Sequence, residues 1–187
     1  MKNLLLFALL IIEISCSGPK VTVQDTPANT DWSQFKTYAF YKLDASGDTI
    51  SSNFSERTQI IKSALTAELN KRGLVQNDSS PDLLINIGLV VKEKVSTRQT
   101  SFTDPDRPKY MGTRNYSWKS ETVETGRYRE GFATFDFVDT KAQKLLWSAG
   151  ANGIIPEKTE SIKKNVDKIV MEILKDFPVK PITTENK

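Results

Sequence analysis

One segment of the sequence constrains the fold more than any other, because its side chains alternate in polarity without a break. After Pro81, apolar residues occupy every second position, namely Leu83, Ile85, Ile87, Leu89 and Val91. The intervening positions are mostly polar or small and comprise Leu84, Asn86, Gly88, Val90, Lys92 and Lys94. In a β-strand, successive side chains point to opposite faces, so residues two positions apart share a face. The pattern predicts a strand in a sheet that buries one face and exposes the other.

Two segments have the period of an amphipathic helix. In the first, Ile61, Leu65 and Leu69 recur at every fourth position, with Ile60 and Ala64 widening the apolar stripe. Its ends are marked by Asn53 and Glu56, which have the spacing of a capping box, and by Gly73, a typical helix stop. The second helix is indicated by Ile162, Val166, Ile169, Val170, Ile173 and Phe177, and Pro178 ends it.

The remaining elements are predicted from shorter patterns. Further strands are expected at residues 37–43, 114–125, 133–138 and 145–149. A polar turn at 139–144 joins the last two strands, and 100–112 has the composition of a loop. The predicted order is therefore β-α-β-β-β-β-α. Short connections then indicate an α+β fold, with a mainly antiparallel sheet of about five strands and two helices packed on one face.

The composition excludes several kinds of site. The chain has 187 residues, which suits one domain, and it contains no histidine. Histidine is the commonest general base and metal ligand, so Ser-His-Asp triads and His-containing zinc sites are excluded. The single cysteine excludes an internal disulfide and a thiolate cluster. We therefore expect no metal and no cofactor, and a net charge of +3 gives no reason to expect nucleic acid.

The N-terminus has the features of an export signal. Lys2 precedes an unbroken apolar run at 4–12, which is far shorter than the ~20 residues that span a bilayer. Ser15 and Cys16 follow this run and resemble a lipobox, in which fatty acyl groups such as palmitate are attached to the cysteine. Residues 1–15 are then a lipoprotein-type signal peptide. Glu13 departs from the usual pattern, and ordinary signal cleavage after Ser17 is the alternative.

The rest of the chain divides into three parts. Residues 16–30 are polar and predict a flexible tether, residues 31–178 form the domain, and residues 179–187 form a loose tail. Lipid on Cys16 would hold the protein to a membrane in the bacterial cell envelope. We expect this membrane to be the outer membrane. Because no acidic run follows the cysteine, we expect the protein to face the periplasm.

Several segments together resemble a known family. They are 31–40 (DWSQFKTYAF), 81–86 (PDLLIN), 131–139 (GFATFDFVD), 144–150 (KLLWSAG) and the closing Phe177-Pro178. In order and spacing they resemble domain of unknown function 4136 (DUF4136), over roughly residues 30–178. The resemblance implies a bacterial envelope lipoprotein without an assigned activity. It implies no catalytic residues.

A polar segment supplies the candidate binding site. Between residues 92 and 129, cations lie among aromatic residues, a combination that suits anionic glycans or headgroups. The candidates are Lys92, Lys94, Arg98, Arg107, Lys109, Tyr110, Arg114, Tyr116, Trp118, Arg127, Tyr128 and Arg129. The alternative is a solvated hairpin. Trp147 is instead predicted to lie in the core.

Three pairs of carboxylates provide a weaker alternative. They are Asp104 with Asp106, Glu121 with Glu124, and Asp136 with Asp139. Glycosidases need two such groups about 5–10 Å apart. However, Asp139 lies at the predicted turn, where side-chain hydrogen bonds to the backbone explain it. We therefore expect a non-enzymatic lipoprotein that binds a protein or glycan partner at the membrane, and keep a carboxylate-dependent hydrolase of cell-wall glycan as the alternative.

Overall fold

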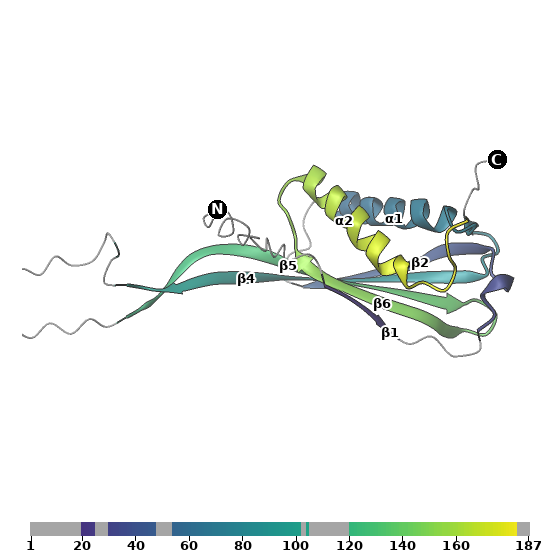
Figure 1. The fold of residues 1–187 in the computed structure, drawn as a ribbon, viewed down its shortest axis with the longest axis horizontal. Coiled ribbons are helices and arrows are strands. Elements are labelled where there is room, and N and C mark those ends of the chain that lie inside the picture. Colours follow the sequence, from purple (N-terminus) through teal and green to yellow (C-terminus); the bar gives the residue numbers. More distant parts are fainter. Residues whose placement is uncertain (1–19, 25–29, 48–53, 102–103, 105–119, 183–187) are drawn as a thin grey trace, which may run out of the picture.

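The structure is a single open sheet with two helices on one face (Figure 1). It is a computed structural model that describes residues 20–24, 30–47, 54–101, 104 and 120–182. The elements are β1 (Lys20–Gln24), the short 3-10 helix η1 (Trp32–Gln34), β2 (Thr37–Gly47), α1 (Phe54–Asn70), β3 (Val75–Gln76), β4 (Leu83–Gln99), β5 (Thr122–Asp139), β6 (Lys144–Ile154) and α2 (Thr159–Lys175). Within the described residues the six strands lie in the order β1-β6-β5-β4-β2-β3. The α+β class and the two helices agree with the sequence prediction.

The sheet is mixed, so the prediction of a mainly antiparallel, five-stranded sheet is wrong. β1, β6, β5 and β4 are joined by antiparallel pairing, whereas β2 pairs in parallel with both β3 and β4. The reason is the position of α1 between β2 and β4 in the sequence. A helical crossover carries the chain back along the sheet, so the strands before and after it run in the same direction.

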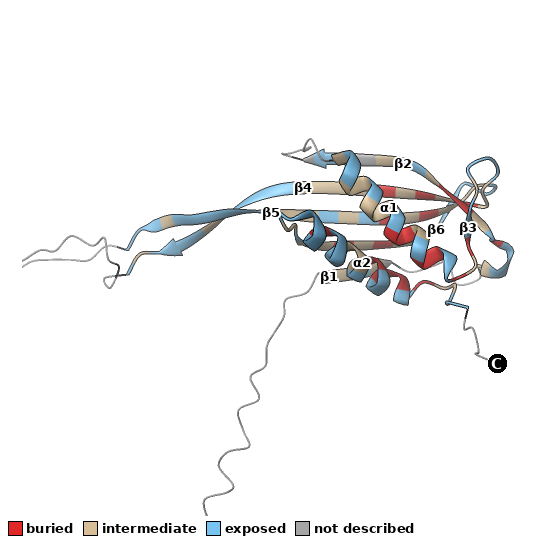
Figure 2. Cartoon of the chain, turned by 90° about the horizontal axis from the view of Figure 1, so that it is seen from above, coloured by how far each residue is buried: buried red, intermediate tan, exposed pale blue. Residues whose placement is uncertain are grey.

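The β4–β5 hairpin is much longer than the sequence pattern indicated. β4 continues past Val91 to Gln99, and β5 joins the predicted strand 133–138 to residues 122–125 of the predicted strand 114–125. Residues 114–119 lie outside the described part of the chain. The two strands leave the rest of the sheet as an arm (Figure 1). The arm is exposed along most of its length because no helix covers it (Figure 2).

Two segments expected to be loose are partly ordered. Lys20–Gln24, inside the predicted tether, forms β1. Its backbone pairs with β6, and the side chains of Val21 and Val23 pack against the core. At the other end, Val179 packs against the core, and the backbone N–H of Ile182 donates to the carbonyl of Lys71 at 2.8 Å. Residues 16–19, 25–29 and 183–187 lie outside the described part of the chain.

The helices begin and end close to their predicted positions. After α1, Gly73 adopts φ of 77°, a left-handed conformation that favours glycine, as expected of a helix stop. Asn53, the predicted N-cap, lies outside the described residues. α2 ends at Lys175, shortly before Pro178. In the part of the chain that the structure describes, neither helix is long and apolar enough to cross a bilayer.

Aromatic side chains fill the core at the end of the sheet away from the arm. Phe177 is fully buried, and its ring lies 5.1 Å from Trp32, 4.8 Å from Phe137 and 5.0 Å from Trp147. The prediction that Trp147 is a core residue is thus confirmed. Figure 2 shows that the buried residues collect at this end, beneath the C-terminal halves of the helices.

A carboxylate ties the first residues of β2 to β4. Asp82 Oδ2 accepts hydrogen bonds from the backbone N–H of Lys36 and of Thr37 at 3.0 Å each, and from the Thr37 hydroxyl at 2.9 Å. These bonds, with the Lys36 backbone N–H bond first, hold the pKa of Asp82 below its ordinary value. The contact fixes the register at which the two parallel strands begin.

Candidate functional site

The side chains on the helix-covered face of the sheet become smaller toward the arm. Near the turn, Phe137 pairs with Trp147. Farther along the same two strands, Ala133 pairs with Ala151, and then Gly131 pairs with Gly153. Small side chains leave space under a helix that large ones would fill. The sequence of β5 and β6 therefore provides a filled core at one end and a hollow at the other.

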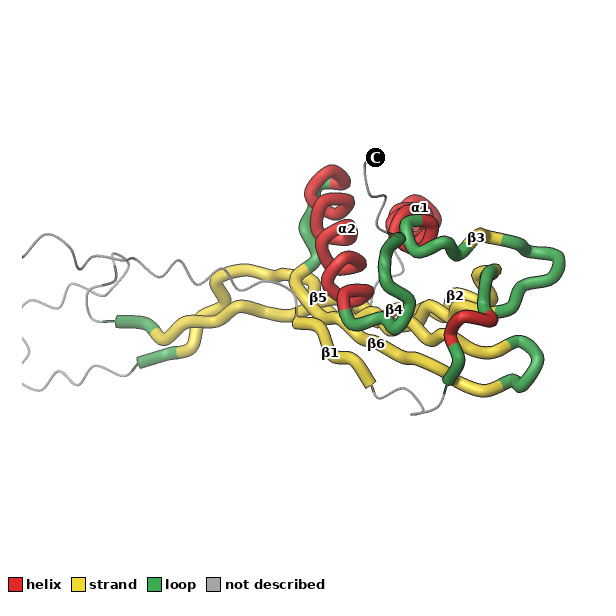
Figure 3. Tube along the Cα trace, turned by 45° about the vertical axis from the view of Figure 1, so that its right-hand side comes forward, coloured by secondary structure: helices red, strands yellow, loops and turns green. Residues whose placement is uncertain are grey.

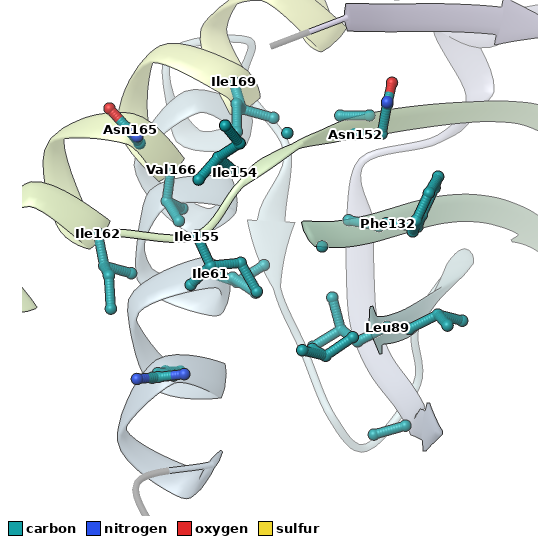
Figure 4. A pocket seen from close by; sticks show the side chains of 18 of the residues that line it. Ile61, Leu89, Phe132, Asn152, Ile154, Ile155, Ile162, Asn165, Val166 and Ile169 are labelled. Atoms are coloured by element: carbon teal, nitrogen blue, oxygen red, sulfur yellow. The ribbon is translucent and has the colours of Figure 1, made fainter. Parts of the chain in front are cut away.

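The hollow is a cavity of about 520 Å³ between the sheet and the N-terminal halves of the two helices. This volume lies within the roughly 300–1,000 Å³ that is usual for ligand pockets. Figure 4 shows that α1, α2, the strands of the sheet and the β6–α2 connection contribute apolar side chains to it. The main apolar contributors are Ile61, Leu89, Ile155, Ile162, Val166 and Ile169.

The slope of α2 keeps the cavity open. In Figure 1 the C-terminal end of α2 lies on the sheet, whereas its N-terminal end is lifted away from it. Figure 3 shows the two helices side by side on one face with differently directed axes. The connection before α2 is fixed by a hydrogen bond from the Ile155 backbone N–H to the Arg129 carbonyl, at 2.8 Å. A Cβ on Gly131 would lie 3.0 Å from the Ile155 side chain, so a glycine keeps this wall in place.

Few polar side chains face the cavity. Among the described residues that line the cavity, Arg57 on the first turn of α1 is the single charged one, and it is partly buried. Within the described residues no acidic side chain pairs with Arg57. Asn165 of α2 is the other polar residue from a helix. Phe132 and Asn152, which also contribute to the rim, occupy strand positions whose side chains alternate toward the uncovered face of the sheet.

The structure divides the predicted basic-aromatic patch between the two sides of the arm. Lys92 pairs with Glu130 and Lys94 with Tyr128, whereas Arg127 and Arg129 occupy the alternate positions of β5. Paired residues share a side of a hairpin, and neighbours along a strand point to opposite sides. Lys92, Lys94 and Tyr128 are therefore separated from Arg127 and Arg129. Half of the patch lies outside the described residues, namely Arg107, Lys109, Tyr110, Arg114, Tyr116 and Trp118.

Acidic partners neutralise part of the patch that is described. Arg127 Nε lies 2.7 Å from Glu124 Oε1, and its guanidinium reaches Glu93 at 3.3 Å, so the pKa of Arg127 is raised above its ordinary value. Arg98 pairs with Asp104 at 2.6 Å, and this bond lowers the pKa of the Asp104 carboxyl. These cations are thus already matched by charges of the same chain.

The other cations have weaker contacts. Lys94 lies 4.0 Å from Glu130, and the Lys92 ammonium lies 5.7 Å from the centre of the Phe132 ring. Exposed ion pairs of this kind contribute little and are screened by salt. The strands of the arm are therefore held together mainly by the backbone pairing of β4 with β5.

The carboxylate pairs are not assembled into a site in the described residues. Asp136 accepts a hydrogen bond from the Ser148 hydroxyl at 2.6 Å. Asp139 accepts the backbone N–H groups of Lys141 and Ala142 at the turn, as the sequence predicted. Asp106 lies outside the described residues. Among the residues the structure does describe, no group of three or more acidic or cysteine side chains is placed to hold a metal ion.

The sequence reasoning missed the cavity. Its floor contains small residues at alternate positions, a signal that is present in 131–133 and 149–153. The signal gains meaning only from the register, which places Gly131 beside Gly153 and Ala133 between Leu89 and Ala151. The sequence did not indicate Arg57 as a site residue, because a cation on the first turn of a surface helix is ordinary.

The geometry defines an α+β protein with an open mixed sheet, two helices on one face and an apolar cavity between the layers. The model of the family described as "Domain of unknown function (DUF4136)" matches residues 22–179. The chain belongs to this family. No curated protein is significantly similar to the chain in sequence.

Several solved structures are similar to this chain at low sequence identity. A PDZ domain protein from Parabacteroides distasonis is 18% identical, with a TM-score of 0.46; the match covers 88% of this chain and 38% of that one. The PelC dodecamer from Paraburkholderia phytofirmans is 11% identical, with a TM-score of 0.48, covering 88% and 99%. A putative neuraminyllactose-binding hemagglutinin homolog from Helicobacter pylori is 10% identical, with a TM-score of 0.40, covering 75% and 82%. This chain thus spans well under half of the length of the first of these proteins.

Proposed function

We propose that this chain is a non-enzymatic lipoprotein of the bacterial cell envelope, whose domain binds an apolar group of a partner or ligand in the cavity beneath α2. The cavity carries the proposal: it has a volume of about 520 Å³, and most of its lining is aliphatic. Such surface is costly to leave exposed, and occupation by an apolar group removes it from water.

The lipoprotein part of the proposal rests on Ser15 and Cys16, which follow the apolar run at 4–12. Lipid at Cys16 would hold the domain at a membrane, on the periplasmic side of the outer membrane. Intact-mass analysis of protein extracted from membranes tests it: we expect Cys16 as the first residue, with added acyl mass. An unmodified chain that starts at Gly18 would contradict it.

The chemistry of the cavity favours an apolar group over a glycan, because sugars need several polar side chains for recognition and the cavity offers few. Binding of a protein or glycan through the basic-aromatic patch stays a second candidate. The described cations Lys92 and Arg129 have no acidic partner within 4 Å among the described residues, and this is the observation in its favour. No aspartate or glutamate is among the described residues that line the cavity, so they give no support to a carboxylate-dependent hydrolase.

The binding proposal is tested with a neutral apolar fluorophore, N-phenyl-1-naphthylamine, and the purified domain. Ala133→Leu places a larger side chain on the cavity floor, whereas Ala142→Leu makes the same change at the exposed β5–β6 turn. We expect the fluorophore to bind the wild type and Ala142→Leu equally, and Ala133→Leu weakly. Unfolding curves check that Ala133→Leu stays folded. Equal binding by a folded Ala133→Leu would refute the proposal.

A further inference from the structure

The charged side chain among the described residues of the cavity indicates the kind of ligand. Arg57 lines the cavity from the first turn of α1, is partly buried, and has no acidic partner in the described part of the chain. A partly buried cation without a partner carries a desolvation cost that a bound anion relieves. A guanidinium also matches the geometry of a carboxylate or a phosphate. The cavity thus combines a single cationic position with aliphatic walls.

The arrangement of the lining indicates an elongated ligand. The cavity crosses four strands, from Ala45 on β2 through Leu89 and Ala133 to Ala151 on β6. Neighbouring strands lie roughly 4.8 Å apart, so three spacings give a floor of about 14 Å. Arg57 and Ala45 come from the elements at one end of this floor, β2 and the helix that follows it. A linear apolar chain with a charged group at one end has the same form.

The start of β1 lies near this cavity. Lys20, the first residue of β1, pairs with Asn152, which contributes to the cavity rim. Cys16 precedes Lys20 by four residues, and four residues reach at most about 14 Å. If acyl groups on Cys16 hold the chain in a bilayer, the cavity end of the sheet is the end near the lipid. A membrane is therefore the nearest source of apolar chains.

We propose that the cavity binds a single-chain anionic acyl lipid, with the acyl chain lying across the small residues of the sheet and the anionic group paired with Arg57. This inference rests on the proposed function and specifies its ligand. A fatty-acid carboxylate and the phosphate of a lysophospholipid share the required chemistry.

Displacement of the neutral fluorophore tests the role of the charge. Dodecanoate and dodecanol have the same chain and differ in the head group. We expect dodecanoate to displace the fluorophore from the wild type at about tenfold lower concentration than dodecanol, the factor expected of one charge-assisted hydrogen bond. We expect Arg57→Gln to remove this preference and to leave the affinity for dodecanol unchanged. Arg57→Lys should retain part of the preference. Lys164→Gln, an equal loss of charge on an exposed position of α2 outside the cavity, retains the full preference.

The length of the chain provides an independent measurement. Across octanoate, decanoate and dodecanoate, each additional buried methylene tightens binding by about fourfold, from ~0.8 kcal/mol per methylene. Affinity stops rising once the chain exceeds the floor of the cavity. Ala133→Leu shortens the chain at which this plateau is reached.

The outcomes separate this inference from the proposed function. If the fluorophore binds and Ala133→Leu weakens its binding, but dodecanoate has no advantage over dodecanol, the cavity is an apolar site and the anionic-lipid inference is wrong. If the fluorophore does not bind the wild type, both are wrong. Native mass spectrometry after incubation with phosphatidylglycerol vesicles that contain oleate, or lysophosphatidylglycerol, identifies which of the two lipids is retained. Retention of neither would also overturn the inference.

Discussion

Replacing Asp82 by asparagine tests whether one carboxylate joins the parallel strands β2 and β4. The carboxylate oxygen Oδ2 accepts three hydrogen bonds, from the backbone N–H groups of Lys36 and Thr37 and from the Thr37 hydroxyl. Asparagine can place its amide oxygen where Oδ2 lies, but this acceptor carries no charge, so each of the three hydrogen bonds becomes weaker. The substitution therefore changes the hydrogen bonding with almost no change in volume.

The expected loss follows from the number and exposure of these bonds. A hydrogen bond contributes about 1 kcal/mol net, and somewhat more when the acceptor is charged. Because the bond from Lys36 is exposed and those from Thr37 are only partly buried, water replaces part of what is lost. We expect Asp82→Asn to reduce the free energy of unfolding by about 2 kcal/mol, or the midpoint of thermal unfolding by roughly 4–8 °C for a chain of this size.

The difference depends on pH with a defined sign. The pKa of folded Asp82 is lowered from its ordinary value of 3.8, chiefly by the Lys36 backbone N–H. The folded protein thus binds the proton less tightly than the unfolded chain does. The contribution is fully present above the unfolded pKa and is lost as pH falls through the folded pKa. The difference in stability between wild type and Asp82→Asn therefore stays constant at neutral pH and narrows in the acid range below 3.8.

Urea unfolding followed by circular dichroism at a series of pH values measures this difference. Asp78→Asn is the control, because the exposed Asp78 carboxylate accepts only from the Gln76 side chain. We expect no measurable shift for it. Equal stability of wild type and Asp82→Asn at neutral pH, or a difference that persists in full in acid, would refute the reasoning.

Two further substitutions test the packing on either face of the sheet, both measured by urea unfolding. Phe177→Ala should cost about 4 kcal/mol, since it empties the centre of an aromatic cluster, whereas Leu145→Ala at a half-exposed position should cost little. Gly88→Ala places a Cβ 2.5 Å from Thr134 Oγ1 and should cost about 1–2 kcal/mol, which Thr134→Ala in the same chain restores. Gly126→Ala, with no atom within 4 Å of the added carbon, is the matched control.

Features of the fold that depend on neighbouring residues were predictable from the sequence. The alternation in 83–91 places Leu83, Ile85 and Ile87 in the core, and the structure buries all three. Gly73 ends α1 because a left-handed residue is a local requirement. The parallel pairing of β2 with β4 was not predicted, although the helix between these strands in the sequence indicates it, because a helical crossover returns the chain so that both strands run in the same direction. β1 was missed because five residues with two valines carry too little pattern to distinguish a strand from a tether.

The candidate site was less predictable than the fold. The patch was predicted because its residues are close together in sequence. Side chains alternate along the strands of the arm, however, so Lys94 and Arg127 lie on opposite sides of it. The cavity was not predicted for the opposite reason. Its residues are far apart in sequence, and only the strand register brings Leu89, Ala133 and Ala151 into one row. A cavity that the side chains leave unfilled has no sequence motif by which it could be recognised.

The pairing of β1 with β6 also governs the order in which the sheet is completed. Val21 lies opposite Ala151, so the two partners are 130 positions apart (151 − 21) in a chain of 187 residues. A growing polypeptide makes β1 first, and β1 stays without its partner until β6 has been made. Closing so long a loop is entropically costly, and contacts between distant parts of a chain slow folding. The β4–β6 meander can form before this closure, and we therefore expect β1 to add to an edge of the sheet that already exists.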